Sequence, residues 1–213
     1  MSGAITSLEF TEKMRGRIRF GTDDPRQGAR PGPASASLMF RLTIEVLDVD
    51  RFVVDPDLEA TARGYVRCEA LGGQFPVERG VFNLFVVADE PNERRMRYRL
   101  WFRDGAGHPL TLVGHKEVRN DRGVDLWSDT TTLFVRLLRG HVEPPDDPVA
   151  EVSATGILRI RLLDFLWQLT TFRARGPHVR ARLRALLLFG RLFVGHLWQV
   201  YGPAGRAQQR DAT

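Results

Sequence analysis

The stretch SLMFRLTIEV, residues 37–46, indicates the fold class most clearly. Leu38, Phe40, Leu42, Ile44 and Val46 fall at every second position, and the polar residues Arg41, Thr43 and Glu45 lie between the last four of them. Successive side chains of a strand point to opposite faces, so this alternation is typical of a strand with one buried face. The stretch therefore predicts a sheet that covers an apolar core.

The same period of two recurs along the first three-quarters of the chain. It appears in segments 10–20, 63–70, 95–103, 110–118, 130–138 and 152–160. Segment 81–87 is apolar at nearly every position, which predicts a strand that is covered on its outside as well. Arginines at 95, 97, 99 and 103 alternate with apolar residues and predict a solvated strand face. About eight strands are expected.

The connections favour an antiparallel meander. Residues 104–107 and 120–123 are glycine-containing turns, and 23–37 and 143–148 are proline-rich loops. One short helix is expected within 48–55. We predict a mainly β fold, a lipocalin-like antiparallel up-and-down barrel of about eight strands with two C-terminal helices; an open β-sandwich is the alternative. The expected domains are a barrel over 1–161, a helical segment over 162–202 and a flexible tail over 203–213.

Charge and cysteine content limit the class of protein. The net charge is +5 and the pI is about 10.1, yet lysine occurs only at Lys13 and Lys116 and the arginines are spread along the chain. This distribution, without a nucleic-acid-binding motif, argues against nucleic acid as a partner. Cys68 is the single cysteine, which excludes an internal disulfide. Residues 1–11 do not resemble a signal peptide, so a cytoplasmic location is expected.

Enzymatic motifs are missing from the sequence. It contains no nucleophile elbow, no dinucleotide-binding glycine motif and no phosphate-binding loop. The five histidines are scattered, so no metal site and no cofactor are expected. Asp125 and Asp129 flank Trp127 and could form an acid–base pair with His115 or Lys116, but turn and capping roles are commoner for such aspartates. We lean towards a protein that is not an enzyme.

Two charged residues, Glu12 and Lys116, fall on faces that otherwise point inward. They could be polar anchors in a ligand pocket, because such pockets place few polar groups on apolar walls. Alternatively, each lies at a barrel rim or bulge and reaches water, which is the interpretation we favour. The candidate barrel-lining residues for ligand binding are Glu12, Phe40, Tyr98, Phe102, Lys116 and Trp127.

The end of the chain has helical periodicity. A helix is expected over 162–172, then a break at Gly176-Pro177, then a final helix to about Tyr201. The final helix is almost wholly apolar after its first turns and is too short and interrupted for a comfortable membrane span. It could pack on its own barrel, dock onto a partner chain or lie in a membrane interface, in that order of preference. The candidate partner or membrane contacts are Arg180, Arg184, Arg191 and Trp198.

Several runs resemble one region of multidomain actinobacterial proteins. These runs are 80–85, 96–99, 125–133, 156–160, 164–165, 168–171 and 197–202. The region is the accessory part, neither flavin-binding nor hydrolase, of oxidoreductases of the glucose–methanol–choline (GMC) type that resemble cholesterol oxidase. The resemblance implies association with sterol- or lipid-directed oxidation, and it carries over no catalytic residue.

Together these observations predict a non-catalytic accessory or binding module. Its expected partner is an apolar ligand, such as a sterol or another lipid, or a GMC-type oxidoreductase or hydrolase. The alternatives are an enzyme with an unrecognised site near 125–132 and a membrane-surface adaptor acting through helix 180–201.

Overall fold

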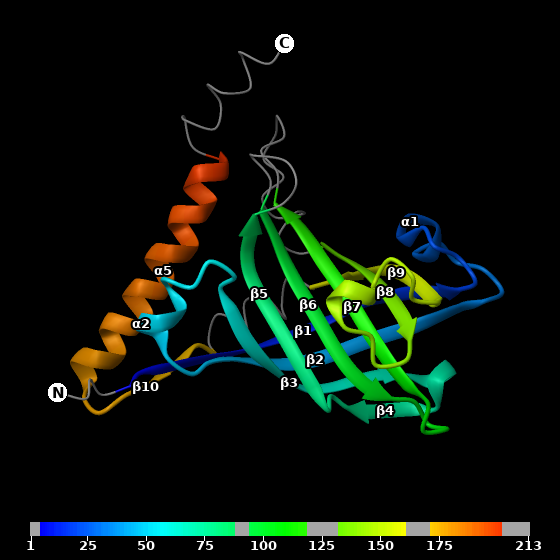
Figure 1. Ribbon diagram of the computed structural model, residues 1–213, viewed down its shortest axis with the longest axis horizontal. Coiled ribbons are helices and arrows are strands. Elements are labelled where there is room, and N and C mark those ends of the chain that lie inside the picture. Colours follow the sequence, from blue (N-terminus) through cyan, green and yellow to red (C-terminus); the bar gives the residue numbers. More distant parts are fainter. Residues whose placement is uncertain (1–4, 88–93, 119–131, 161–170, 202–213) are drawn as a thin grey trace, which may run out of the picture.

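A closed antiparallel barrel forms the body of the protein in the computed structural model, which describes residues 5–87, 94–118, 132–160 and 171–201 (Figure 1). Among these residues each barrel strand pairs with its neighbour, and β9 pairs with β1 to close the ring. The eight barrel strands are β1 (Ser7–Phe20), β2 (Ser35–Val46), β3 (Glu59–Cys68), β5 (Arg79–Val87), β6 (Arg94–Arg103), β7 (Pro109–Val118), β8 (Thr132–Arg139) and β9 (Val152–Arg159). The predicted lipocalin-like barrel is confirmed.

Short elements decorate the barrel. Strand β4 (Gly73–Pro76) pairs with β3, and β10 (Arg173–Arg175) pairs with the start of β1. The helices are α1 (Pro25–Gly28), α2 (Val49–Phe52) and α5 (Val179–Tyr201), with single 3₁₀ turns at Glu69–Leu71 and Pro144–Asp146. The expected short helix in 48–55 and the final helix are both present. The expected helix over 162–172 falls almost wholly outside the described residues.

Two expectations about these elements need correction. The loop expected over 23–37 contains α1, whose first turn is capped by the Asp24 side chain accepting from the Arg26 amide, and β2 already begins at Ser35. Strand β10 was not predicted, because three residues are too few to show a periodic pattern. Its place is set by pairing with distant β1, which sequence alternation does not reveal.

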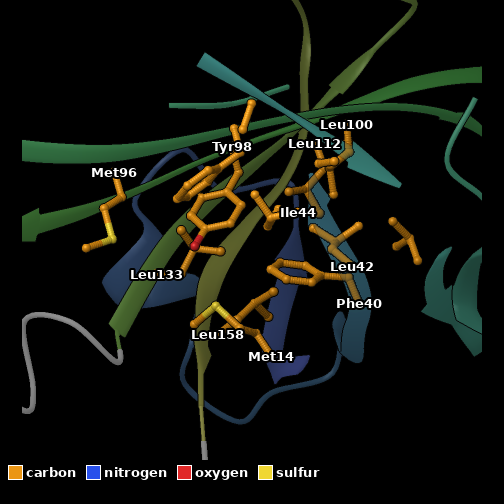
Figure 2. Packing of buried hydrophobic residues seen from close by; sticks show 14 of the residues in the cluster. Met14, Phe40, Leu42, Ile44, Met96, Tyr98, Leu100, Leu112, Leu133 and Leu158 are labelled. Atoms are coloured by element: carbon orange, nitrogen blue, oxygen red, sulfur yellow. The ribbon is translucent and has the colours of Figure 1, made fainter. Parts of the chain in front are cut away.

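The inward side chains fill the barrel with apolar groups. The predicted inward row on β2, from Leu38 to Ile44, is completely buried. Figure 2 shows Tyr98 projecting among the labelled core side chains, and its ring lies 5.9 Å from that of Phe40, centroid to centroid. At another part of the barrel Phe75 of β4 stacks on Phe102, with ring centroids 6.1 Å apart. Eight-stranded barrels have interiors about wide enough for side chains to fill, and the described interior follows this rule.

Closure of the ring requires glycine where β1 crosses β9. A Cβ atom at Gly16 would lie 2.0 Å from the Ile157 carbonyl oxygen, and one at Gly156 would lie 2.1 Å from that of Arg17. No Cβ can occupy these positions without moving the backbone. The two glycines therefore allow the first and last barrel strands to approach closely enough to pair.

The outer arginine row of β6 is not uniformly solvated. Arg97 and Arg103 are exposed, as predicted, but Arg99 is only 9% exposed. The chain that follows β8 covers it: Arg99 donates to the Val142 carbonyl at 2.9 Å and forms an ion pair with Asp147. The prediction is wrong at Arg99 because alternation identifies the face of a strand and not what lies over that face.

Strand β5 is apolar on both faces for a local reason. A β-bulge between Asn83 and Val86, with Phe85 at a positive φ of 52°, lets Leu84 and Phe85 both be buried. Helix α5, which could pack on its own barrel, lies mainly against β10, α2 and β1 and does not provide the outer cover of β5. The run of apolar residues therefore reflects the bulge.

Candidate binding sites in the barrel and on α5

A buried polar cluster lies inside the barrel. Glu12 of β1 accepts from Lys116 Nζ of β7 on Oε1 at 2.5 Å and from the Tyr98 hydroxyl of β6 on Oε2 at 2.7 Å. The three residues are 1%, 3% and 1% exposed. The rim interpretation that we favoured for Glu12 and Lys116 is therefore wrong, since neither side chain reaches water. Each strand contributes one polar residue to an otherwise apolar inner face, and the barrel brings the three together.

The cluster pairs one acidic with one basic side chain and adds a neutral hydroxyl. An ammonium group has three N–H donors. Among the described residues, Glu12 is the one hydrogen-bond acceptor of Lys116, and the Tyr98 ring lies 5.2 Å from Nζ. Burial, and then the neighbouring Glu12 carboxylate, raise the pKa of Tyr98 well above its usual value of 10.0. Tyr98 is thus held as a neutral donor.

The other candidate lining residues divide into two groups. Phe40 and Phe102 are completely buried on the inner face, and Phe40 lies 5.9 Å from the Tyr98 ring, centroid to centroid. Trp127 lies outside the described residues. The structure therefore gathers five of the six sequence candidates in one barrel interior, although Phe40 and Phe102 serve there as packed core.

A cavity of about 400 Å³ lies elsewhere, between the end of β2, α2 and the start of β3. Its floor includes Val46, Phe52 and Ala60, and its rim carries the carboxylates of Glu45, Asp48, Asp55, Asp57 and Glu59. Asp48 and Asp55 accept from nearby backbone amides, so these two carboxylates stabilise local turns. None of the five predicted lining residues that the structure describes borders this cavity.

The inner face of α5 packs on its own barrel. Ala185 and Phe189 are 2% and 6% exposed. The Phe189 ring contacts Phe10, Phe52 and Phe172, with centroids 6.2, 6.3 and 5.8 Å away. Phe10 belongs to the inner face of β1, so this aromatic cluster joins the helix to the barrel core. Figure 1 shows α5 beside α2 and β10, at the flank of the barrel.

The outer face of α5 is apolar and uncovered. Val179, Leu183, Leu186 and Leu187 are 65%, 54%, 37% and 71% exposed. Spacings of three and four residues place them on one side of the helix. Of the predicted contact residues, Arg180 and Arg191 are exposed, whereas Arg184 forms an ion pair with Asp50 at 2.9 Å. The side chain of Trp198 lies outside the described residues.

The candidates for catalysis are not assembled into a site in the described part of the chain. Asp125 and Asp129 lie outside it. His115 is on the outer face of β7, as predicted, but it is half-buried and stacks on Phe134 with centroids 5.5 Å apart. Within the described residues no group of three histidine, cysteine or acidic side chains could hold a metal ion. None of the described helices has both the length and the apolar character needed to cross a bilayer.

Comparison with known proteins finds no matching family model, no matching curated protein and no matching solved structure.

Proposed function

We propose that this protein is a non-catalytic binding module that docks on an anionic lipid surface through the outer face of α5. The observation that carries the proposal is the exposed apolar stripe formed by Val179, Leu183, Leu186 and Leu187. Four large apolar side chains gathered on one helix face are more than the scattered exposure that is normal for a soluble protein. Helices that lie in a membrane interface bury such a stripe at the boundary of headgroups and acyl chains.

Arginines flank the stripe on both edges. Arg180 and Arg191 are eleven residues apart, about three helical turns, so they share one edge, and Arg182 lies on the other. Among the described residues, none of these three guanidinium groups has a carboxylate within salt-bridge distance. Arginines in these positions reach the headgroup level when the apolar stripe enters the lipid, because their long side chains keep the charge at the polar boundary.

The charge distribution favours anionic lipid over neutral lipid. Residues 165–210 contain eight arginines and no acidic residue, whereas the whole chain has a net charge of +5. The remainder of the chain is therefore net negative, at −3. Each basic residue near an anionic membrane contributes about 1 kcal/mol to binding. Concentrating the positive charge on the segment that bears the apolar stripe orients α5 towards the membrane and the rest of the protein away from it.

The inner face of α5 supports the same orientation. Phe189 fixes the helix to the barrel through Phe10 and Phe52, so the helix presents its outer stripe as a rigid surface. No folding cost is then added when the stripe meets a membrane. The GMC-type oxidoreductase or hydrolase partner implied by the resemblance stays a prediction, because no contact among the described residues bears on it.

The proposal is tested by co-sedimentation of the full chain with vesicles. Vesicles of phosphatidylcholine alone are compared with vesicles containing about 30% phosphatidylglycerol. We expect binding to the anionic vesicles, weak or no binding to the neutral ones, and loss of binding as salt rises from about 0.1 to about 0.5 M. The double variant Leu183→Glu/Leu187→Glu should abolish binding.

A matched control uses an exposed apolar residue away from α5. Val149 is 84% exposed, in the turn after Pro148, so Val149→Glu removes an equally accessible apolar group. It should bind like the wild type. Equal binding to neutral and anionic vesicles, or no binding to either, would overturn the proposal. So would a wild-type dimer that Leu183→Glu/Leu187→Glu converts to a monomer, because the stripe would then bind a second copy.

A further inference from the structure

The cavity between the end of β2, α2 and the start of β3 has no part in membrane docking through α5. Its volume is about 400 Å³, and small-molecule sites usually enclose about 300–1,000 Å³. The buried side chains of Val46, Phe52 and Ala60 form its floor, and the exposed side chain of Leu47 adds apolar surface at its edge. The cavity therefore has room for a short organic molecule and an apolar surface for that molecule to cover.

The charge around this cavity is opposite to that of the whole chain. Residues 45–59 contain six acidic residues and one arginine, whereas the net charge of the chain is +5. Asp50 pairs with Arg184 of α5 at 2.9 Å, and the other five carboxylates border the cavity together with Arg51. Complementary charge attracts one kind of ligand and repels the other. A cation is therefore favoured at this cavity and an anion is disfavoured.

The carboxylates are spread around the rim instead of converging on one point. In the described residues, which include the whole lining of the cavity, no three acidic, histidine or cysteine side chains are grouped so that they could hold a metal ion. Asp55 accepts from the backbone amides of Asp57 and Glu59, at 3.0 and 3.3 Å, and so fixes the segment that carries these two exposed side chains. This spacing suits an organic ion with a polar end and an apolar body better than a metal ion.

From the volume, the apolar floor and the charge of the rim we infer that this cavity binds a short alkylammonium ion. The alkyl chain lies on the floor at Val46 and Phe52, where it removes apolar surface from water. The ammonium group stays at the rim and donates to the carboxylates of Asp57 and Glu59, as charge-assisted hydrogen bonds require. This site goes beyond the proposed function, because its ligand is a soluble cation and not a lipid surface.

The test compares four probes, hexylammonium, methylammonium, 1-hexanol and hexanoate, by calorimetric titration of the full chain without vesicles. Hexylammonium should bind with one molecule per chain. Methylammonium lacks most of the apolar body and 1-hexanol lacks the charge, so each should bind at least about tenfold more weakly. Hexanoate should bind most weakly of the four, because the rim repels it.

Each departure from this order would overturn the inference. Equal binding of methylammonium and hexylammonium would mean that the acidic rim attracts cations without a site for the alkyl chain. Equal binding of 1-hexanol and hexylammonium would mean that the carboxylates select nothing. Failure of hexylammonium to bind would mean that the cavity holds only water.

Two exposed carboxylates locate the site. Asp57→Asn/Glu59→Gln keeps the size of both side chains and should weaken hexylammonium binding at least about fivefold while leaving 1-hexanol binding unchanged. Phe52 is unsuitable for substitution, because its ring also packs on Phe189 of α5.

The matched control removes the same number of charges away from the cavity. Asp23 and Asp146 are exposed and do not line it, so Asp23→Asn/Asp146→Asn should bind hexylammonium as the wild type does. Equal weakening in both double variants would show an effect of net charge alone. Unchanged binding in Asp57→Asn/Glu59→Gln would place the probe elsewhere. Either result would contradict a site at this cavity.

Cation binding and membrane docking fail independently of each other. Vesicle binding depends on Leu183 and Leu187, so Leu183→Glu/Leu187→Glu should still bind hexylammonium. Asp57→Asn/Glu59→Gln should still bind anionic vesicles. A protein that binds vesicles but no hexylammonium keeps the proposed function and loses this inference.

Discussion

Leucines and basic residues are buried or paired in the barrel but exposed and unpaired on the outer face of α5, as far as the described residues show. In the barrel, leucines such as Leu42 and Leu112 are completely buried, and the charged groups Lys116 and Arg99 are each paired with a carboxylate. On α5, Leu187 is 71% exposed and Arg191 has no carboxylate partner among the described residues. The barrel buries its own apolar side chains and pairs these charged groups, whereas the outer face of α5 leaves apolar side chains and arginines that an external partner can cover or pair. The predictions below separate these two cases.

The largest effect is expected from breaking the interior ion pair. Lys116→Met leaves the Glu12 charge buried and unpaired, which should lower the free energy of unfolding by about 3–5 kcal/mol. Glu12→Gln/Lys116→Met removes both charges and should recover most of that loss. Urea denaturation measures both values. A single variant as stable as the wild type would show that the pair is hydrated and not enclosed.

Substitutions on the two faces of α5 should differ strongly in how much they lower the stability of the protein. Phe189→Ala removes a buried ring that contacts Phe10, Phe52 and Phe172, and it should cost about 3 kcal/mol of stability. Leu187→Ala, on the outer face of the same helix, should change stability by no more than about 0.5 kcal/mol. Thermal unfolding monitored by circular dichroism gives both. Comparable losses would mean that the outer face is covered in solution.

A smaller effect is expected at the covered part of the outer barrel wall. Arg99→Met removes the hydrogen bond to Val142 and the ion pair with Asp147, so stability should fall by about 1–3 kcal/mol. Limited proteolysis should then cut within 140–148 faster than in the wild type. Arg97→Met, two residues away on the same face but exposed, is the control and should leave both measurements unchanged.

The smallest effect concerns alkaline pH. The pKa of Tyr98 is raised in the folded protein, so above about pH 10 the unfolded chain loses this proton while the folded chain keeps it. The unfolded state then binds fewer protons, and stability falls as pH rises. Tyr98→Phe should show a shallower decline between about pH 9 and about pH 11.5. Identical slopes would mean that Tyr98 titrates normally.

Much of the fold could be predicted because it rests on local alternation. The period-two rows, such as the one from Leu38 to Val46, identify both the strands and their inner faces. The same rows placed Glu12, Tyr98 and Lys116 on inward faces, which was sufficient to select them as candidates. What could not be predicted was their depth. Whether an inward charge lies near a rim or in the core depends on the pairing of β1, β6 and β7, which are distant in sequence.

Features that depend on burial by segments distant in the sequence were missed or wrongly assigned. Arg99 looks like its neighbours on β6 in the sequence, and only the return of the chain at Val142 and Asp147 buries it. Helix α5 is apolar on two faces, so its periodicity does not say which one packs. The contact of Phe189 with Phe10 and Phe52 decides this, and it joins residues far apart in the chain. The sequence signal that supports the proposed docking is the absence of acidic residues from 165 to 210.

The most direct test of the central claim is the environment of a probe on the outer face of α5. Leu187→Cys can be labelled with an environment-sensitive fluorophore, because the native Cys68 is buried and its thiol pKa is raised by that burial. Vesicles containing phosphatidylglycerol should shift the emission to the blue and protect the label from an aqueous quencher, since an interfacial helix inserts its apolar face about 5–10 Å. A label at Val149→Cys should not respond. An unchanged spectrum at position 187, or an equal response at position 149, would contradict docking through α5.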